Sequence, residues 1–151
     1  MSEELFKEMA QSILDGDDEV SAELAQKALT EGIDPLAAIT DGFMPGVNEV
    51  GENFACGDAF LPELVMAGEA MKAAIAVLEP AMMASGVTRQ VLGTVVLATV
   101  EGDIHEIGKT LVGTMLTSSG FKVYDMGVDV PTADLIAKAE EVGADIIGLS
   151  A

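Results

Sequence analysis

The sequence is poor in the residues that build disulfides and metal clusters. Its 151 residues include one cysteine, one histidine and no tryptophan. A single cysteine, Cys56, excludes an internal disulfide, cannot form a thiolate cluster for a metal, and fits a reducing compartment. No basic residue adjoins Cys56 in the sequence, so we interpret it as a structural or incidental thiol and not as a nucleophile.

Basic residues are also scarce. Seven lysines and arginines, scattered singly, stand against 26 aspartates and glutamates, which gives a formal net charge of -19. Nucleic acids and anionic membranes require clustered lysine and arginine to offset phosphate charge. The composition therefore argues against both as partners and favours proteins or a small molecule.

The sequence also lacks long apolar runs and a signal peptide. The N-terminus "MSEELFKEMA" is acidic and amphipathic, whereas a signal peptide has a basic start followed by an apolar stretch. No apolar stretch is long enough to cross a bilayer. We therefore expect a cytoplasmic protein, and the 50% of hydrophobic residues predict a packed core.

The first part of the chain predicts helices. Apolar residues recur there at spacings of three and four, and good helix formers dominate. Short connections between four such helices predict an antiparallel four-helix bundle as a cap domain over residues 1–85. The predicted boundaries are the end of the first helix at "DGDD", the end of the second at Gly32, the start of the third at Pro35 with a kink or division at Pro45, and a fourth helix from Pro62 to about Leu78.

The second part of the chain predicts alternating strands and helices. After a predicted linker "ASGVTRQ" at 84–90, the β-branched run "VLGTVVLATV" is typical of a parallel strand buried on both faces. Helices at about 108–119 and 131–141 then alternate with strands at 121–126 and 144–151. This order predicts a Rossmann-like (flavodoxin-like) parallel sheet over residues 90–151. The chain stops on its third strand, which would leave an apolar edge, so we expect an incomplete domain and a fragment of a longer protein.

The stretch "EGDIHEIGKT", Glu101 to Thr110, contains the only histidine. It follows the carboxyl end of the first predicted strand, where sheets of this type bind ligands. One histidine cannot complete a zinc site, but a cofactor that brings its own equatorial ligands, such as haem or a corrinoid, needs only one axial donor. Asp103 is placed to accept the proton of the other ring nitrogen of His105. Gly102 and Gly108 would let a bulky planar cofactor approach the backbone.

Simpler interpretations of this stretch remain open at this point. A lone histidine in a polar loop is often only a solvent-exposed residue. Asp103 alone is equally compatible with a helix N-cap or with a phospho-acceptor of the receiver type, whose aspartates also lie at strand ends.

The longer pattern around this stretch resembles a known signature. "DIHEIG" is followed by 41 residues, 109 to 149, and then by Ser150. This resembles the cobalamin-binding signature D-x-H-x-x-G, 41 residues, S-x-L and a later G-G. The helical segment "VGENFACGDAFLPELVMAGEAMKAAIAVLEP" resembles the cap of methionine synthase and of corrinoid proteins. The chain departs from the pattern at Ala151, after which the leucine and the G-G are missing.

The resemblance implies a set of site residues. His105 would be the lower axial ligand of cobalt, displacing the cofactor's own dimethylbenzimidazole in a base-off, His-on state, and Asp103 would be its hydrogen-bonded partner. The remaining cofactor-binding positions that it implies are Gly102, Ile104, Glu106 and Gly108 along the corrin, Ser150 facing the displaced nucleotide tail, and Phe60, Leu61, Leu64 and Val65 as a lid over the upper face. The alternative for the last four is bundle core, since apolar residues at this spacing usually pack inside.

The resemblance also implies a function. The chain is similar to the small corrinoid proteins of methylamine, methanol, betaine or methoxyarene methyltransferase systems. Such a subunit, not itself catalytic, carries methylcobalamin; it accepts a methyl group on cobalt from a substrate-specific methyltransferase and passes it to a second methyltransferase with a folate or thiol acceptor. A reductive activase would be a further partner.

Three alternatives to the carrier function stay open. The first is a cobalamin module cut from a mutase or a methionine-synthase-like enzyme, although mutase modules usually lack this helical cap. The second is a corrinoid sensor, although no helix-turn-helix precedes the helices. The third is an acidic α/β domain without metal.

Overall fold

The computed structural model of the 151-residue chain describes residues 2–85 and 91–151. The chain divides into two compact units, Met1–Arg89 and Gln90–Ala151, each of which is described by itself. Of the predicted linker at 84–90, Ala84 and Ser85 belong to the last helix of unit 1, and positions 86–90 lie outside the described residues.

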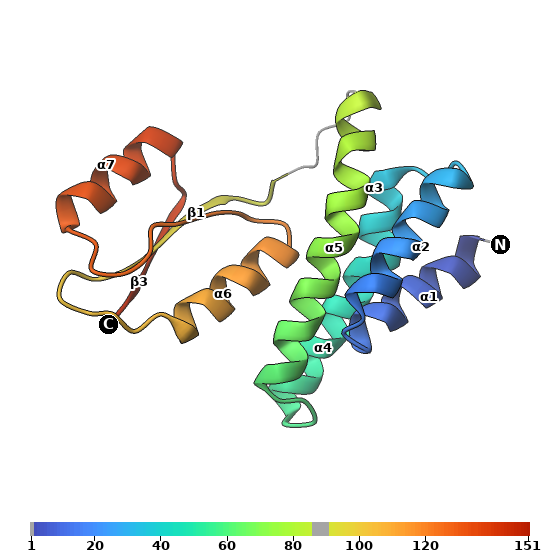
Figure 1. Cartoon of the computed structure of the whole chain (residues 1–151), viewed down its shortest axis with the longest axis horizontal. Helices are drawn as coiled ribbons and strands as arrows, with labels where there is room; N and C mark the ends of the chain where they lie inside the picture. Colours follow the sequence, from blue (N-terminus) through green and yellow to red (C-terminus); the bar gives the residue numbers. More distant parts are fainter. Residues whose placement is uncertain (1, 86–90) are drawn as a thin grey trace. The chain divides into compact units, whose positions relative to one another are not determined.

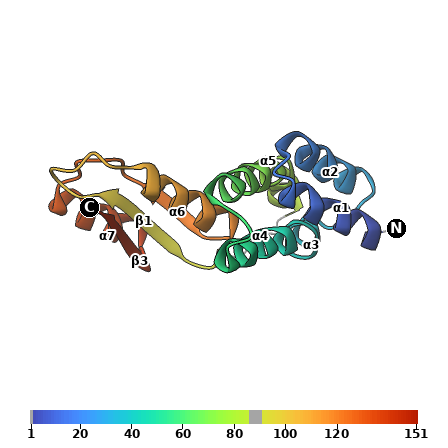
Figure 2. The same cartoon turned by 90° about the horizontal axis from the view of Figure 1, so that it is seen from below.

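Unit 1 is helical, and its long helices pack side by side (Figures 1 and 2). The predicted four-helix arrangement is confirmed. A short helix and a π-helical turn precede the third long helix, and Pro45 lies in the first turn of that third helix. The largest fully buried side chains of this unit are Met9, Ile13, Phe43, Met71 and Leu78. Its elements are α1 (Ser2–Leu14), α2 (Asp18–Thr30), α3 (Pro35–Ala37), η1 (Ala38–Phe43), α4 (Met44–Cys56) and α5 (Leu61–Ser85).

The last helix of unit 1 is longer than the sequence predicted. Its expected end near Leu78 was wrong, because α5 continues through Pro80 to Ser85. Leu78 and Met82, on either side of the proline, are buried, while Pro80 itself is exposed. The burial of these neighbours offsets the hydrogen bond that proline removes from the helix. In the part of the chain that the structure describes, no helix combines the length and apolarity that crossing a membrane requires.

Gly46 marks a close approach of α4 to α1. A Cβ atom at this position would lie 2.4 Å from the carbonyl oxygen of Ala10 and 2.8 Å from Cβ of Ile13. Both distances are far below ordinary contact, and one neighbour is a backbone atom that cannot move without shifting α1. Gly51, in the same helix, has no atom within 4 Å of the equivalent position.

We expect Gly46→Ala to destabilise unit 1 by about 1–3 kcal/mol, the usual cost of overpacking. Gly51→Ala is the matched control and should stabilise by up to about 1 kcal/mol, because alanine is the better helix former. Urea unfolding followed by helical circular dichroism measures both. Equal stabilities of the two variants would contradict the close packing of α1 and α4.

Unit 2 is a three-layer α/β structure. Its three strands are parallel in the order β2-β1-β3, with α6 and α7 on opposite faces (Figure 1). Leu97 of β1 lies against Gly113 of α6, whereas Val96 and Ala98 pack with Leu135 of α7. The predicted Rossmann-like fold is confirmed. Its elements are β1 (Thr94–Thr99), α6 (Ile107–Ser118), β2 (Lys122–Asp125), α7 (Thr132–Val142) and β3 (Ile146–Ser150).

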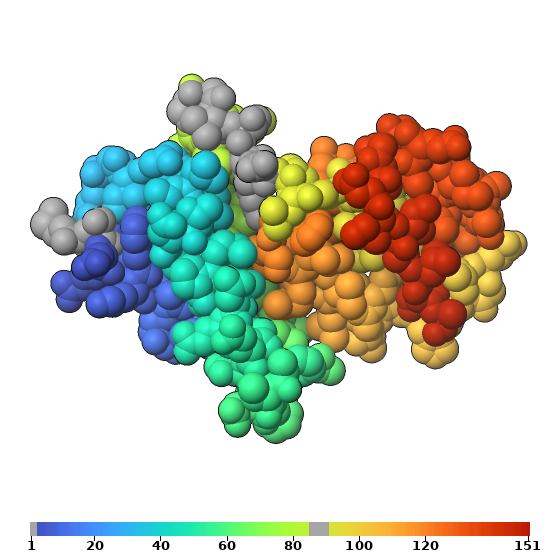
Figure 3. Space-filling model, turned by 180° about the vertical axis from the view of Figure 1, so that it is seen from behind, coloured from blue at the N-terminus to red at the C-terminus, as the bar shows by residue number. Residues whose placement is uncertain are grey.

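The strands of unit 2 differ in burial as their positions in the sheet require. The central strand β1 is buried from Val95 to Thr99, as its continuous apolar run predicted. The edge strand β3 is exposed, with Ile146 and Leu149 51% and 60% exposed. In the space-filling view the C-terminal residues, in dark red, lie at the surface (Figure 3).

Candidate cofactor site

The histidine loop begins at the point where the strand order of the sheet reverses. After β1 the chain passes through α6 to β2 on one side of β1, and then through α7 to β3 on its other side. Such a switch point opens a crevice at the carboxyl ends of the strands, where ligands bind in this class of sheet. Val100, the first residue after β1, pairs with Val130 and donates its N–H to the carbonyl of Ser150 at 2.9 Å. The loop therefore leaves from a fixed edge.

His105 is held by Asp103. Nδ1 of the ring lies 2.5 Å from Oδ1 of Asp103, and the backbone N–H of His105 donates to the same oxygen at 3.1 Å. The side chain of His105 is 88% exposed and that of Asp103 only 18%. A carboxylate on Nδ1 fixes the ring orientation and leaves Nε2 as the nitrogen available for another contact. The structure thus brings together the two residues that the sequence paired.

The pKa of Asp103 lies below its ordinary value of 3.8, because the ring and the backbone N–H of His105 both donate to its carboxylate. Because the pKa of Asp103 is lowered in the folded protein, its contact with His105 stabilises the fold at pH values above the ordinary pKa. This stabilisation is lost as the pH falls through the lowered pKa. The other oxygen, Oδ2, is buried and has no hydrogen-bond partner among the described residues. The carboxylate therefore remains charged at neutral pH and keeps a spare acceptor.

The backbone of the loop is also fixed. Thr99, fully buried at the end of β1, donates its hydroxyl to the carbonyl of His105 at 2.8 Å. Gly102 takes a φ of +86°, a conformation that favours glycine, and the N–H of Asp103 closes a turn onto Val100 at 3.1 Å. The N-cap position of α6 is occupied by Glu106 and not by Asp103, so the N-cap interpretation of Asp103 was wrong.

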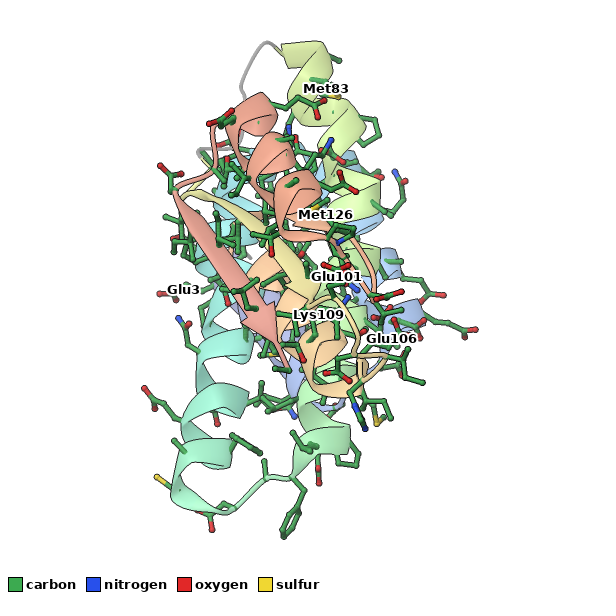
Figure 4. The ribbon with its side chains drawn as sticks, turned by 90° about the vertical axis from the view of Figure 1, so that its left-hand side faces the viewer. Glu3, Met83, Glu101, Glu106, Lys109 and Met126 are labelled. Carbon is green, nitrogen blue, oxygen red and sulfur yellow. The ribbon has the colours of Figure 1, made fainter. Side chains whose placement is uncertain are left out.

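The surface around His105 suits a large flat ligand. Ile104 is 76% exposed, and a Cβ atom at Gly102 or Gly108 would meet no atom within 4 Å. Figure 4 draws the side chains of this region and labels Glu101 and Glu106, which bracket the loop. Nowhere in residues 2–85 and 91–151 do three or more histidine, cysteine or acidic side chains gather as a metal site.

A groove starts beside the loop and runs between α6 and the sheet. It has a volume of about 350 Å³ and is lined in part by Gly108, Val112, Gly148 and Ser150. Gly148 lies close against Leu97, because a Cβ atom there would lie 2.4 Å from Cδ2 of Leu97. Ser150, predicted to face the nucleotide tail, thus lies in the same groove as Gly108.

The predicted lid residues belong to unit 1. Phe60 and Leu61, at the start of α5, are 67% and 50% exposed, and Glu63 caps this end by accepting the N–H of Phe60 at 3.0 Å. Leu64 is buried in the bundle core, and Val65 is half-buried. The four apolar residues therefore have different environments, which the sequence did not distinguish.

Two residues that contact the loop were missed in the sequence. Thr99 looked like part of the apolar strand, and Asp129 lies in the connection between β2 and α7. The signal for Asp129 was available, because loops that follow neighbouring parallel strands meet at the same edge of the sheet.

Comparison with known proteins identifies the family. Residues 5–79 and 93–151 match two family models, each described as a B12 binding domain. Over 148 residues the chain is 46% identical to a corrinoid protein of Desulfitobacterium hafniense. The alignment covers 97% of this chain and 68% of that protein. The chain belongs to the B12-binding corrinoid proteins.

Further relatives of this corrinoid protein agree with the assignment. Trimethylamine corrinoid protein 1 of Methanosarcina mazei is 46% identical over 149 residues, covering 99% of the chain and 69% of that protein. The structure of the methanol:cobalamin methyltransferase complex from Methanosarcina barkeri matches with a TM-score of 0.87 at 33% identity, covering 97% of this chain and 55% of that chain. This corrinoid protein thus spans about two thirds of the length of its curated relatives.

The residues present fit the cofactor that the family implies. A corrinoid surrounds cobalt with four ring nitrogens, so the single imidazole of His105 suffices as a protein ligand. A Cβ atom at Gly102 or Gly108 would meet no atom within 4 Å, so a flat ring would find no obstacle at these two positions, and a groove begins beside Gly108. The predicted cofactor, a corrinoid of the cobalamin type, is confirmed by the family.

Proposed function

We propose that this corrinoid protein is a methyl carrier that serves methyltransferases and catalyses neither transfer itself. The observation that supports this proposal best is the single exposed imidazole, held by Asp103 at the switch point of the sheet. Relatives named as trimethylamine corrinoid proteins, and a neighbour named as a methanol:cobalamin methyltransferase complex, support the methyl chemistry. When bound, the corrinoid supplies the cobalt that accepts and releases the methyl group.

The proposed binding mode is base-off and His-on. Nε2 of His105 would hold the cobalt in place of the cofactor's dimethylbenzimidazole. The groove that begins at Gly108 and contains Ser150 would hold the nucleotide. The backbone of Gly102, Ile104 and Glu106 borders the corrin, where the exposed loop leaves room.

Asp103 tunes the ligand in this proposal. Its ionised Oδ1 holds the proton on Nδ1, which strengthens donation from Nε2. Its buried Oδ2, which has no hydrogen-bond partner among the described residues, remains a spare acceptor. A proton taken up by the pair weakens donation from Nε2, so the pair adjusts the axial ligand without moving the backbone.

The proposed partners are proteins. A substrate-specific methyltransferase delivers the methyl group, a second methyltransferase passes it to a folate or a thiol, and a reductive activase restores the cofactor. The net charge of -19 steers basic surfaces of such partners toward the chain. Phe60 and Leu61, exposed at the start of α5, are the lid candidates that shield the upper face and move aside for each partner.

The carrier proposal is tested with a labelled methyl group. The chain is loaded with cobalamin under reducing conditions and mixed with ¹⁴C-labelled trimethylamine or methanol and the corresponding methyltransferase of a relative. We expect the label to accompany the chain on gel filtration and to leave it when a thiol and a second methyltransferase are added. Omission of the first methyltransferase is the control. A chain that retains cobalamin but takes no label from either donor would contradict a carrier role toward trimethylamine and methanol.

A further inference from the structure

Asp129 reaches the histidine loop from a different part of the chain. It lies between β2 and α7, yet its Oδ1 accepts the N–H of Gly102 at 2.7 Å. Its own N–H donates to the carbonyl of Asp103 at 3.0 Å. The two hydrogen bonds flank the peptide unit that joins Gly102 to Asp103. One residue thus fixes both ends of the turn that carries the partner of His105.

The backbone of Asp129 is itself specialised for this contact. Its φ of +52° lies in the left-handed region, and no other non-glycine residue described in the structure has a positive φ. Aspartate tolerates this conformation better than most residues, but it is sparsely populated and persists where surrounding contacts impose it. Such conformations gather at functional sites, and here the conformation directs both the carboxylate and the N–H of Asp129 at the same turn.

The segment around Asp129 is anchored on the sheet. The carbonyl of Gly127 accepts the N–H of Thr99 at 2.9 Å, and the N–H of Val130 donates to the carbonyl of Thr99 at 3.0 Å. Thr99 is the residue whose hydroxyl holds the carbonyl of His105. The histidine loop is therefore held at its start by the backbone of Ser150, at its turn by the carboxylate and N–H of Asp129, and at its end by the hydroxyl of Thr99.

We propose that Asp129 is a positioning residue for His105: it fixes the Gly102–Asp103 turn so that the Asp103 carboxylate meets Nδ1 and Nε2 is presented to the cobalt. This inference rests on the proposed ligand role of His105. It adds that the pair of Asp103 and His105 is positioned by Asp129, a residue of the connection between β2 and α7.

Three substitutions separate the properties of Asp129. Asp129→Asn retains a side-chain oxygen that accepts the N–H of Gly102 and still tolerates a positive φ. Asp129→Gly retains the backbone conformation but removes the acceptor. Asp129→Ala removes the acceptor and adds backbone strain. If Asp129 serves only the fold of its own connection, Asp129→Gly, which relieves the strain, should perform as well as Asp129→Asn.

The first measurement is amide hydrogen exchange in the cofactor-free protein. Loss of a hydrogen bond to a charged acceptor should accelerate exchange of the Gly102 amide by about tenfold or more in Asp129→Gly. The same amide should stay protected in Asp129→Asn. The exchange of amides in α7 serves as an internal control, because a general loss of stability would accelerate those as well.

The second measurement is the visible absorption spectrum with cobinamide, a corrinoid that lacks the nucleotide and so reports ligation by His105 without using the groove. We expect Asp129→Asn to match the wild type. Asp129→Gly should need roughly tenfold more cobinamide to reach the same imidazole-ligated spectrum, in the lower range for loss of an outer-shell partner. Thermal unfolding of each variant shows that the comparison is made on folded protein.

The outcomes separate this inference from the function it rests on. An imidazole-ligated spectrum that forms in Asp129→Gly as readily as in the wild type overturns the positioning role and leaves His105 as the ligand. An equal loss in Asp129→Asn and Asp129→Gly also overturns it, because the acceptor would then not be the cause. If the wild type shows no imidazole ligation, both the proposed function and the positioning role fail together.

Discussion

Replacing His105 by alanine is expected to lower the affinity for cobalamin by at least about 100-fold. Loss of a residue that only supports a metal ligand costs up to about 100-fold, and loss of the ligand itself should cost at least as much. The stability of the fold should change by less than about 0.5 kcal/mol, as for an exposed surface residue. The reason is that the side chain of His105 is 88% exposed and engages the fold through the carboxylate of Asp103. Equilibrium dialysis gives the affinity, and thermal unfolding gives the stability.

Glu101→Ala is the matched control for His105→Ala. Glu101 is exposed on the same loop, has no assigned role in the site, and its replacement should leave the affinity unchanged. Equal affinities of the wild type and His105→Ala would contradict the ligand role. A large loss of stability in His105→Ala would contradict the exposed position of the ring.

Removal of Asp125 is expected to have the largest effect on the stability of unit 2. Asp125 forms an ion pair with Lys109, whose side chain is only 2% exposed, and it also accepts the N–H of Gly127 at 2.9 Å. Asp125→Ala leaves the ammonium of Lys109 buried without its partner, which should cost about 3 kcal/mol or more. Lys109→Met, in contrast, retains an apolar side chain of similar length at the buried position. Asp125 then loses its ion pair, but its side chain is 37% exposed and still contacts water and the N–H of Gly127. This variant should cost less than about 1.5 kcal/mol.

The pair is tested by a double-mutant cycle. Tyr124 is the only tyrosine and the chain has no tryptophan, so its fluorescence follows the unfolding of unit 2. The double variant Lys109→Met with Asp125→Ala should be more stable than Asp125→Ala alone, because it removes the unpaired buried charge. Single variants of equal cost, or a double variant whose cost is the sum of both, would show that the buried charge does not govern this site.

The sequence predicted those features that local patterns determine. The apolar run of β1 is continuous because the strand is central and covered on both faces. This run marked the end of the strand in the sequence, and so it also marked where the following loop begins. His105 and Asp103 are two residues apart, so their contact needs only the local turn. Gly102 takes a positive φ in this turn, a conformation that glycine tolerates because it has no Cβ atom.

Contacts between distant segments could not be predicted in the same way. The bond from Asp129 to Gly102 joins residues 27 apart, and it depends on how two loops meet after the strands have paired. The pairing of Lys109 with Asp125 likewise requires α6 to lie on β2. Phe60 and Leu64 are both apolar and close in sequence, yet one is exposed and the other is buried, because packing and not composition decides their environments.

The most direct test of the account is electron paramagnetic resonance of the cobalt(II) form of bound cobalamin, in protein grown with ¹⁵N-labelled histidine. The chain has one histidine, so the label reports only His105. A lower-axial nitrogen splits each cobalt line by its nuclear spin, into a triplet for ¹⁴N and a doublet for ¹⁵N. Ligation by His105 predicts a triplet in unlabelled protein that becomes a doublet with labelled histidine. A triplet that persists with the label would show that the cofactor's own benzimidazole remains bound, and would contradict ligation by His105.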